Sequence, residues 1–406
     1  MTHQPQSLLV TGGAGFIGAN FVNYWMQRYP IHRVTVLDAL TYAGNIENLA
    51  SLREQPHFRF VHGDIRDFDT IAQALCDDAV DTIVHFAAES HVDRSIHGPD
   101  AFIDANVLGT HTLLKAAKAV WLDRENRAVH RFHHVSTDEI YGTLGPEDPP
   151  FAETTPYAPN SPYAASKAAS DHLVRAYHHT YGLNTTTSNC SNNYGPYHFP
   201  EKLIPLLIVN MLAGKPLPVY GDGLQVRDWL HVEDHCRGID RVIHKGTAGE
   251  TYNIGGNNER PNMEIVTLLC GLMDAAFKTT PALHERFPQA PPTEGRSCAE
   301  LITHVTDRPG HDRRYAINAQ KAMRVLGYRP EIIFEDGSTQ PVVTDETWRV
   351  EESAAYGTGH KLGYSTGVTE NIEADRLVVG WQSARFNDSR WERATIQDAR
   401  RWKLYA

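Results

Sequence analysis

The segment SLLVTGGAGFIGANFVNYW, residues 7–25, limits the possible folds of this chain more than any other stretch. A short apolar run leads through closely spaced glycines into a segment with helical apolar periodicity, which predicts a strand, a tight turn and a helix. Gly12 permits the sharp turn, Gly15 lets a ligand approach the backbone, and Gly18 lets the helix pack tightly on the strand. The helix N-terminus would then face an anion such as a pyrophosphate. The pattern predicts a dinucleotide-binding cradle.

A glycine motif alone is weak evidence, but an acidic residue follows it at the expected place. The apolar run HRVTVLDAL contains Asp38, 20 residues beyond Gly18. A carboxylate at this position binds the ribose hydroxyls of a dinucleotide. No arginine follows within the next several positions, so a 2′-phosphate would meet an anion and no cation. The sequence therefore favours NAD over NADP.

Further strand-like runs (FRFVHGDI, DTIVHFAAES and RFHHVSTDE) alternate with helical stretches. This alternation predicts an α/β fold with a doubly wound parallel sheet of the Rossmann type and a smaller mixed α/β substrate domain. Ligands of such sheets bind beyond the carboxyl ends of the strands, where Asp64, Ala87, Ala88 and Ser90 fall. For Asp64, a contact to adenine and a role as a helix N-cap or turn residue are equally open.

Composition narrows the class of protein. The 406 residues are 41% hydrophobic and 21% charged, which is typical of a globular protein of two or three domains. Neither a secretory signal nor an apolar run of about 18 residues is visible, so we expect a cytoplasmic protein without membrane contact. The net charge of −11 argues against nucleic-acid binding. The five scattered cysteines and the histidines lack metal-ligand spacing, so no metal is expected.

The segment NSPYAASKAASDHLV predicts a helix that begins at Ser161 and Pro162, a cap followed by a first-turn proline. Tyr163 and Lys167 are four residues apart and share one helix face. A phenol has a pKa near 10. A neighbouring ammonium group and an oxidised nicotinamide ring would favour the phenolate. Such pairs also arise by chance, but the position after a dinucleotide cradle favours a catalytic pair.

The stretch HVSTDEIYG places Asp138 and Glu139 side by side after an apolar strand. The two carboxylates could form a solvated loop or an acid and a base. Adjacent like charges raise the pKa of one group, so one carboxyl can be protonated while the other is ionised.

The chain resembles the extended short-chain dehydrogenase/reductase family and, within it, the dTDP-glucose 4,6-dehydratases, over about residues 7 to 337. The motifs that carry this resemblance are TGGAGFIG, LDALTYAGN, HGDIRD, AAESHVDRS, VSTDEIYG, SPYAASKA, SNNYGPYHFPEKLIP, VYGDG, RDWLHVEDH, ETYNIGG and DRPGHDRRYAI. Epimerases of the same family usually carry a serine and small residues where this chain has Thr137, Asp138 and Glu139. The triplet therefore favours a dehydratase.

The resemblance implies conversion of dTDP-glucose to dTDP-4-keto-6-deoxyglucose and water, by transient C4 oxidation, C5–C6 elimination and hydride return to C6. This reaction supplies precursors of deoxysugars such as dTDP-rhamnose. Tyr163, assisted by Lys167 and Thr137, would take the C4 hydroxyl proton. Glu139 would take the C5 proton, and Asp138 would protonate the departing C6 hydroxyl. A dehydratase or epimerase of another nucleotide sugar and a catalytically idle NAD-binding scaffold remain as alternatives.

The resemblance also implies binding residues and a homodimer formed through a two-helix face that includes the helix of Tyr163. The expected NAD-binding residues are Gly12, Gly15, Phe16, Ile17, Gly18, Asp38, Asp64, Ile65, Ala87, Ala88, Ser90, Asn106, Tyr163 and Lys167. The expected substrate-binding residues are His91, Thr137, Asn192, Glu201, Lys202, Leu203, Tyr220, Arg227, Asn262, Arg308 and His311. Arg227 and Arg308 suit a diphosphate because guanidinium binds anions in a bidentate manner.

The expected domains are an NAD-binding domain (1–188 and 230–256), a nucleotide-sugar-binding domain (189–229 and 257–337) and a tail (338–406). The tail departs from the family pattern, which usually ends in an amphipathic helix. Its segments TDETWRV and GWQSARFNDSRWERA faintly resemble the N-terminal β-sandwich of bacterial α-L-rhamnosidases. About 60 residues is too short for a complete sandwich, so a β-like or poorly ordered tail is expected.

Overall fold

The computed structural model describes residues 3–123, 129–332, 349–350 and 392–393. The chain forms two compact units. The first consists of Met1–His198, Leu224–Asn262 and Asp307–Phe334. The second consists of Phe199–Gly223, Met263–Thr306 and Glu335–Ala406.

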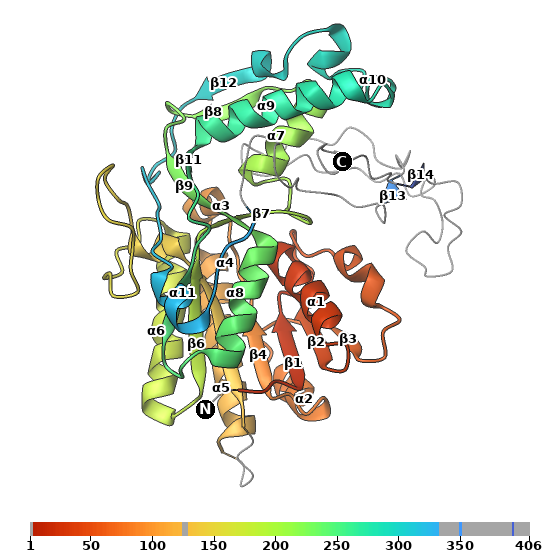
Figure 1. Cartoon of the computed structure of the whole chain (residues 1–406). Helices are drawn as coiled ribbons and strands as arrows, with labels where there is room; N and C mark the ends of the chain where they lie inside the picture. The colour runs from red at the N-terminus through yellow and green to blue at the C-terminus, as the bar shows by residue number, and fades with distance from the viewer. Residues whose placement is uncertain (1–2, 124–128, 333–348, 351–391, 394–406) are drawn as a thin grey trace. The chain divides into compact units, whose positions relative to one another are not determined.

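A seven-stranded sheet forms the centre of the first unit, with the strand order β10-β6-β5-β4-β1-β2-β3 (Figure 1). Its strands are β1 (Ser7–Thr11), β2 (Arg33–Asp38), β3 (Phe58–His62), β4 (Thr82–His85), β5 (Arg131–Thr137), β6 (Thr185–Cys190) and β10 (Thr251–Ile254). Every neighbouring pair is parallel. The chain reverses its direction of travel across the sheet between β1 and β4, and ligands bind at such a switch point. The predicted doubly wound α/β fold is confirmed.

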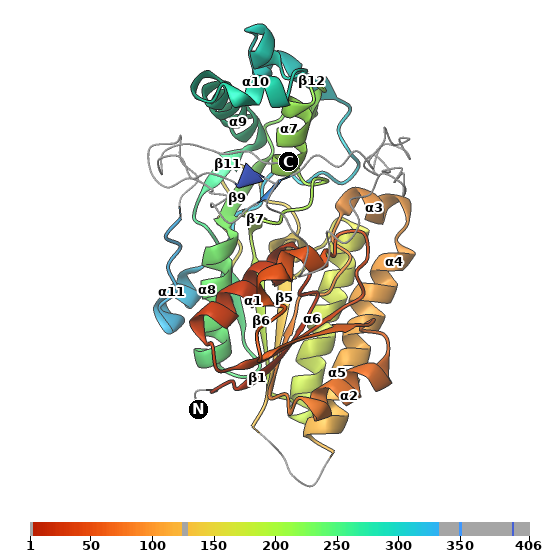
Figure 2. The same cartoon turned by 90° about the vertical axis from the view of Figure 1, so that its right-hand side faces the viewer.

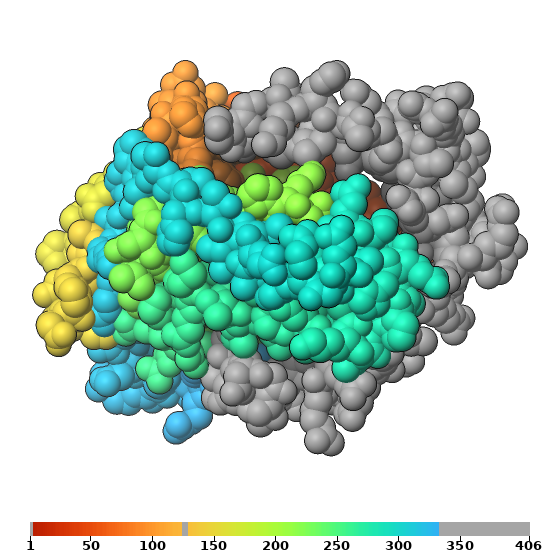
Figure 3. Space-filling model, turned by 90° about the horizontal axis from the view of Figure 1, so that it is seen from above, coloured from red at the N-terminus to blue at the C-terminus, as the bar shows by residue number. Residues whose placement is uncertain are grey.

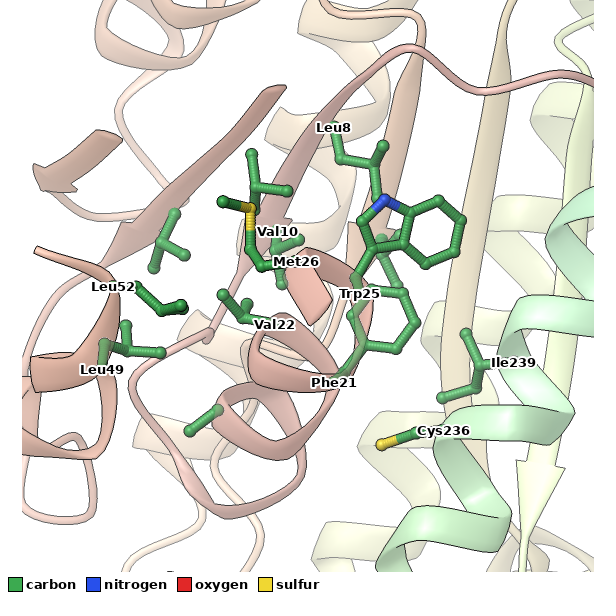
Figure 4. Packing of buried hydrophobic residues seen from close by; sticks show 14 of the residues in the cluster. Leu8, Val10, Phe21, Val22, Trp25, Met26, Leu49, Leu52, Cys236 and Ile239 are labelled. Atoms are coloured by element: carbon green, nitrogen blue, oxygen red, sulfur yellow. The ribbon is translucent and has the colours of Figure 1, made fainter. Parts of the chain in front are cut away.

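Helices cover both faces of this sheet (Figure 2). The main ones are α1 (Phe16–Arg28), α2 (Phe68–Asp77), α5 (Thr110–Trp121), α6 (Pro162–Tyr181), α8 (Val232–Lys245) and α11 (Gln320–Leu326). On one face α1 packs beside α8, and on the other α5 packs between α2 and α6. In Figure 4, Phe21, Val22 and Trp25 of α1 turn toward the sheet and α8. Their spacing follows the helical period, so burial of this apolar stripe fixes the helix that follows the glycine turn.

Short elements connect the strand ends of the first unit. They are η1 (Ile46–Leu52), α3 (Val92–His97), α4 (Asp100–Phe102), the π-helix η2 (Ile103–Gly109) and η3 (Asp138–Tyr141). A small sheet with the order β11-β9-β7 is formed by β7 (Asn192–Tyr194), β9 (Val226–His231) and β11 (Glu259–Pro261). The pairing of β7 with β9 is parallel and that of β11 with β9 is antiparallel.

The second unit contains α7 (Leu203–Leu212), β8 (Leu217–Tyr220), most of α9 (Asn262–Thr279), α10 (Ala282–Arg286), η4 (Pro291–Glu294), η5 (Cys298–Leu301) and β12 (Ile302–Val305). β8 and β12 form a parallel pair. Figure 3 shows the surface that this part of the chain presents, with α9 and α10 in teal.

The compact units differ from the domain division expected from the sequence. Residues 189–198, 224–229, 257–262 and 307–334 were expected in the substrate domain but pack with the first unit. The reason is strand pairing and burial: β9 pairs with β7, and Tyr328 packs in a cluster with Tyr252 and Ile254 of β10. The assignment of functional domains remains a prediction.

The expected tail, residues 338–406, lies almost wholly outside the described residues. Within it, β13 (Arg349–Val350) pairs antiparallel with β14 (Glu392–Arg393). In the described part of the chain, none of the helices combines the length and apolar character needed to cross a bilayer.

Candidate active site

The three glycines predicted to form the cofactor cradle, Gly12 and Gly15 in the turn and Gly18 in α1, differ in the space around them. Gly12 has a φ of +70°, and a Cβ there would lie 2.6 Å from the backbone nitrogen of Ala87. A Cβ at Gly18 would lie 2.2 Å from the carbonyl oxygen of Gly12. At Gly15 the nearest described atom to such a Cβ is the same oxygen, at 3.4 Å. The tight positions hold the turn against the sheet, and the roomier one begins α1, as a phosphate cradle requires.

Asp38 ends β2 beside this turn. Its carboxylate accepts hydrogen bonds from the backbone N–H of Ala14, at 2.9 Å, and of Leu40, at 2.8 Å. Burial raises the pKa of Asp38, while these two bonds act in the opposite direction. Each carboxylate oxygen can accept more than one hydrogen bond. The side chain is therefore held in one orientation and keeps acceptor capacity for the predicted ribose contact.

Asp64 is not a helix N-cap, because Asp67 caps α2. Its carboxylate instead pairs with Arg66 at 2.7 Å, and Arg66 also lies 3.6 Å from Asp104. The hydrogen bond from Arg66 lowers the pKa of Asp64. The backbone carbonyl of Asp64 closes a turn with the N–H of Asp67. A turn role is thus seen, and the adenine contact remains a prediction.

Asn106 lies buried in the π-helix η2 and connects two parts of the site. Its side-chain nitrogen donates to the Glu89 carbonyl oxygen at 2.9 Å and to the Ser166 hydroxyl at 2.8 Å. Its side-chain oxygen accepts from the Glu89 N–H at 2.8 Å. The loop after β4, which contains the predicted cofactor residues Ala87, Ala88 and Ser90, is thereby fixed to α6. π-Helical turns often occur at functional sites.

The carboxyl end of β5 and the start of α6 bring the predicted catalytic residues together. Thr137 ends β5, and its hydroxyl contacts the Asp138 carboxylate at 3.4 Å and accepts from the Glu139 N–H at 3.3 Å. The Tyr163 hydroxyl is hydrogen-bonded to the Thr137 side chain. As predicted, Ser161 caps α6 by accepting from the N–H at 164, and proline follows.

Asp138 and Glu139 differ in environment. Asp138 is 2% exposed, and Glu139 is only partly buried. Burial raises the pKa of Asp138 well above its ordinary value, and the charges of Glu139 and Asp228 raise it further. Asp138 therefore stays protonated where an exposed carboxyl would ionise.

Tyr163 and Lys167 are both buried on one face of α6. Burial raises the pKa of Tyr163 well above its usual value, Glu139 adds to this rise, and the hydrogen bond from Thr137 opposes it. The ammonium of Lys167 donates to the Val135 carbonyl oxygen at 2.9 Å. Among the chain's own groups, burial and Glu139 favour the neutral phenol. The expected phenolate depends also on an oxidised nicotinamide ring, so it remains a prediction.

Arg227 of β9 is the most buried of the predicted anion ligands, with 5% exposure. Its guanidinium donates to the carbonyl oxygens of Val226, at 2.7 Å, and Asp312, at 3.0 Å, and lies 4.2 Å from the centre of the Tyr315 ring. Burial lowers the pKa of Arg227, whereas Tyr315 and Glu139 raise it. Its positive charge thus acts on the catalytic carboxylates as well as on any anion bound nearby.

The other predicted substrate residues fall in different places. Arg308 pairs with Asp93 at 3.0 Å, and His311 pairs with Asp307 at 2.6 Å. His91 caps α3. Asn192 begins β7, and Asn262 begins α9. Glu201, Lys202, Leu203 and Tyr220 belong to the second unit, at the start of α7 and the end of β8.

Asp312 and Tyr315 are site residues that the sequence analysis did not single out. The Tyr315 hydroxyl donates to the Asp312 carboxylate, which also accepts from the Asn160 side chain at 2.7 Å. Asn160 lies just before α6, so the segment that contains Arg308 and His311 is tied to the start of the catalytic helix. Both residues lie inside the motif DRPGHDRRYAI, but no spacing rule marks them.

Comparison with known proteins identifies the family of this chain. The family model described as GDP-mannose 4,6 dehydratase matches residues 9–340, which places the chain among the nucleotide-sugar dehydratases. A dTDP-glucose 4,6-dehydratase of Xanthomonas campestris is 57% identical over 345 residues, covering 84% of this chain and 94% of the relative. That of Escherichia coli K12 is 49% identical over 376 residues, covering 90% and 99%. The chain belongs to the dTDP-glucose 4,6-dehydratase family.

Solved structures show the same fold. A dTDP-glucose 4,6-dehydratase of Streptomyces venezuelae, solved with NAD bound, is 48% identical with a TM-score of 0.71, and the match covers 81% of this chain and 93% of that one. A UDP-glucuronic acid 4-epimerase of Bacillus cereus is 27% identical with a TM-score of 0.68, and the match covers 80% and 94%. Because dehydratase and epimerase share the fold, the fold alone does not distinguish the two reactions.

A second family model, the α-L-rhamnosidase N-terminal domain, matches residues 303–406. This confirms the resemblance noted in the tail. The match overlaps the dehydratase match between residues 303 and 340.

Proposed function

We propose that this chain is an NAD-dependent dTDP-glucose 4,6-dehydratase that forms dTDP-4-keto-6-deoxyglucose and water, a precursor for deoxysugars such as dTDP-rhamnose. The observation that carries the proposal is the group formed by Thr137, Asp138 and Glu139 at the end of β5, beside Tyr163. This group offers a buried neutral carboxyl, a more exposed carboxyl and a phenol within one site. Elimination of water next to a transient ketone needs these three proton-transfer groups.

NAD is the cofactor that the residues fit. Gly12, Gly15 and Gly18 form the pyrophosphate cradle, and Asp38 stands ready for the ribose. Phe16, Ile17, Asp64, Ile65, Ala87, Ala88, Ser90 and Asn106, with Tyr163 and Lys167, complete the proposed binding set. When bound, NAD supplies a hydride acceptor for C4 and returns the hydride to C6.

The chain's own residues then carry the protons. Tyr163, as the phenolate that Lys167 and an oxidised nicotinamide ring would favour, takes the C4 hydroxyl proton as C4 becomes a ketone, and the Thr137 side chain lowers its pKa. The ketone acidifies the C5 hydrogen, which Glu139 removes as general base. Asp138 donates a proton to the C6 hydroxyl, which leaves as water. Glu139 returns the proton to C5 at the end.

Two different environments divide the work between the adjacent carboxyls. Burial and the negative charge of Glu139 keep the proton on Asp138, so it can act as the acid. Glu139 is more exposed and lies in the field of Arg227, which favours its ionised form. Paired carboxyls whose pKa values are driven apart supply an acid and a base at one pH.

Substrate recognition rests on the remaining predicted residues. Arg227, Arg308 and His311 supply positive or hydrogen-bonding groups for a diphosphate. Asn192, Asn262 and His91 of the first unit are proposed to bind the nucleotide sugar. Glu201, Lys202, Leu203 and Tyr220, which belong to the second unit, remain predicted substrate residues. The choice of thymine as the base rests on family membership.

The test is to incubate the purified protein with dTDP-glucose and measure the alkali-induced absorbance of a 4-keto-6-deoxy sugar. Product with dTDP-glucose supports the proposal. Product only with UDP- or CDP-glucose would refute the proposed substrate and keep the reaction. A C4 epimer as the sole product, or no turnover of any nucleotide sugar, would refute the reaction itself.

We also propose a cytoplasmic homodimer that binds neither nucleic acid nor a membrane, formed through the face of α5 and α6. Leu108 and Ile103 in η2, which leads into α5, are 51% and 46% exposed, and Tyr181 at the end of α6 is 49% exposed. Apolar side chains of this kind gather at subunit interfaces. Light scattering coupled to size-exclusion chromatography should give twice the mass of the chain, and Leu108→Glu should shift it toward the monomer.

A further inference from the structure

A buried carboxylate lies one helical turn beyond Lys167. Asp171 is 5% exposed, and it shares the helix face of Lys167 because the two are four residues apart on α6. The Tyr157 hydroxyl donates to one of its oxygens at 3.1 Å. Nε2 of His134 lies 3.1 Å from the other oxygen. Two polar side chains from separate segments thus converge on Asp171.

A buried ammonium group needs compensation for the water that it loses. Lys167 is 4% exposed, and a neutral acceptor, the Val135 carbonyl oxygen, lies 2.9 Å from its nitrogen. A neutral acceptor does not balance a full charge. Asp171 is the carboxylate that acts on this ammonium from the same helix.

Asp171 also reaches a cavity. A cavity of about 230 Å³ is lined by residues that include Glu153, Tyr157, Asp171, His172 and Arg175. Tyr157 and Asp171 therefore form part of its wall. The cavity gives the carboxylate a polar surrounding that a dry core would deny it.

We propose that Asp171, oriented by Tyr157 and His134, is a positioning residue for the dehydratase reaction that keeps Lys167 charged and in place beside Tyr163. The inference deepens the proposed function and rests on it. Asp171 touches neither substrate nor cofactor in this scheme. It acts through Lys167.

The charges around the pair decide the expected pH dependence. On α6, His172 and Lys167 face Asp171, and burial raises the pKa of Asp171 to about 6. From β6, Cys190 acts on Lys167. On β5, burial keeps the pKa of His134 well below its usual value, and the same holds on β4 for His85, whose ring centre lies 5.2 Å from that of His134.

His134 and His85 stay neutral, so they add no charge near Lys167. Asp171 is the carboxylate whose charge raises the pKa of Lys167. Burial lowers the pKa of Lys167, and the charge of Asp171 raises it. Without that charge Lys167 loses its proton at a lower pH. The alkaline limb of the profile of kcat against pH then moves to lower pH.

The experiment compares wild-type protein with Asp171→Asn, using dTDP-glucose and NAD. We expect the alkaline limb to move to lower pH by about one unit, because a neighbouring opposite charge shifts a pKa by about one unit or more. The KM for dTDP-glucose should change little. Tyr157→Phe keeps the charge and removes one hydrogen bond, so it should cause a smaller shift in the same direction. It also serves as the test if Asp171→Asn does not fold.

Asp240→Asn is the matched control. Asp240 also accepts hydrogen bonds from tyrosines, Tyr24 and Tyr29, and pairs with His244 at 2.7 Å, but it lies on α8. This variant should lose stability and keep the wild-type pH profile. A folded Asp171→Asn protein, or failing that a folded Tyr157→Phe protein, with the wild-type profile would overturn the inference and leave the proposed function standing. A wild-type protein that turns over no nucleotide sugar would refute both.

Discussion

The two proposed ligand-binding regions of the first unit, which we call the cofactor end and the catalytic end, are built by different means. The cofactor end, around Gly12, Gly18 and Asp38, uses backbone geometry and comes from one continuous segment of chain. The catalytic end, around Asp138 and Tyr163, uses buried ionisable side chains from η3, α6 and β9. Substitution at the first end should therefore act on folding and cofactor affinity. Substitution at the second should act on rate, and in some cases it should even increase stability.

The largest expected effect is at the catalytic end. Glu139→Gln removes the general base and should lower kcat by about 10²- to 10⁴-fold. Oxidation at C4 should persist, so absorbance of reduced nicotinamide should appear without the 4-keto-6-deoxy product. The control is Glu147→Gln, an exposed carboxyl in the loop after β5. Wild-type turnover of Glu139→Gln would show that another group removes the C5 proton.

Gly18→Ala probes the cofactor end. The new Cβ would lie 2.2 Å from the Gly12 carbonyl oxygen, a backbone atom that can yield only if the turn shifts. Overpacking of this kind costs about 1–3 kcal/mol, so Tm and NAD affinity should fall together. Gly271→Ala in α9 is the matched control, because no described atom lies within 4 Å of its Cβ position. Unchanged NAD binding in Gly18→Ala would refute the close packing of turn and helix.

Asp138→Asn should separate rate from stability. The pKa of Asp138 is raised in the folded protein, so between the unfolded and the folded pKa the folded state binds more protons and its stability falls as pH rises. The amide does not ionise and escapes this loss. Between pH 4 and pH 7 the Tm of the variant should therefore rise relative to the Tm of wild type. A stability difference of about 1 kcal/mol corresponds to roughly 2 °C in Tm. The kcat of the variant should fall. Parallel Tm curves would contradict the raised pKa.

The smallest effect is expected at Asp64, which is partly exposed. If its carboxylate binds adenine, Asp64→Asn should weaken NAD binding by only a few fold, because one hydrogen bond contributes about 0.5–1.5 kcal/mol. Asp67→Ala removes the N-cap of α2 and should lower Tm without changing NAD affinity. Calorimetric titration with NAD compares the two. Equal NAD affinity in wild type and Asp64→Asn would leave Asp64 with its turn role alone.

Local signals in the sequence were sufficient for much of the site. The glycine spacing predicted the turn before α1, and Ser161 with Pro162 predicted the start of α6. Both depend on neighbours within a few residues, which is why pattern reasoning found them. The same reasoning does not reach the ionisation of Tyr163. Its pKa depends on burial and on Glu139, which lies 24 positions earlier in the chain.

The sequence by itself determined the alternation of strands and helices, and it was enough to predict the cofactor cradle and the proton-transfer residues, because periodicity and short motifs are local. Only the tertiary structure decided the environments of those residues. It buried Asp138 more deeply than Glu139 and stacked Arg227 on Tyr315. It also placed Asp171 against His134 and Tyr157. The physical reason is that desolvation and Coulomb interactions depend on distances between segments, and a linear pattern does not record those distances.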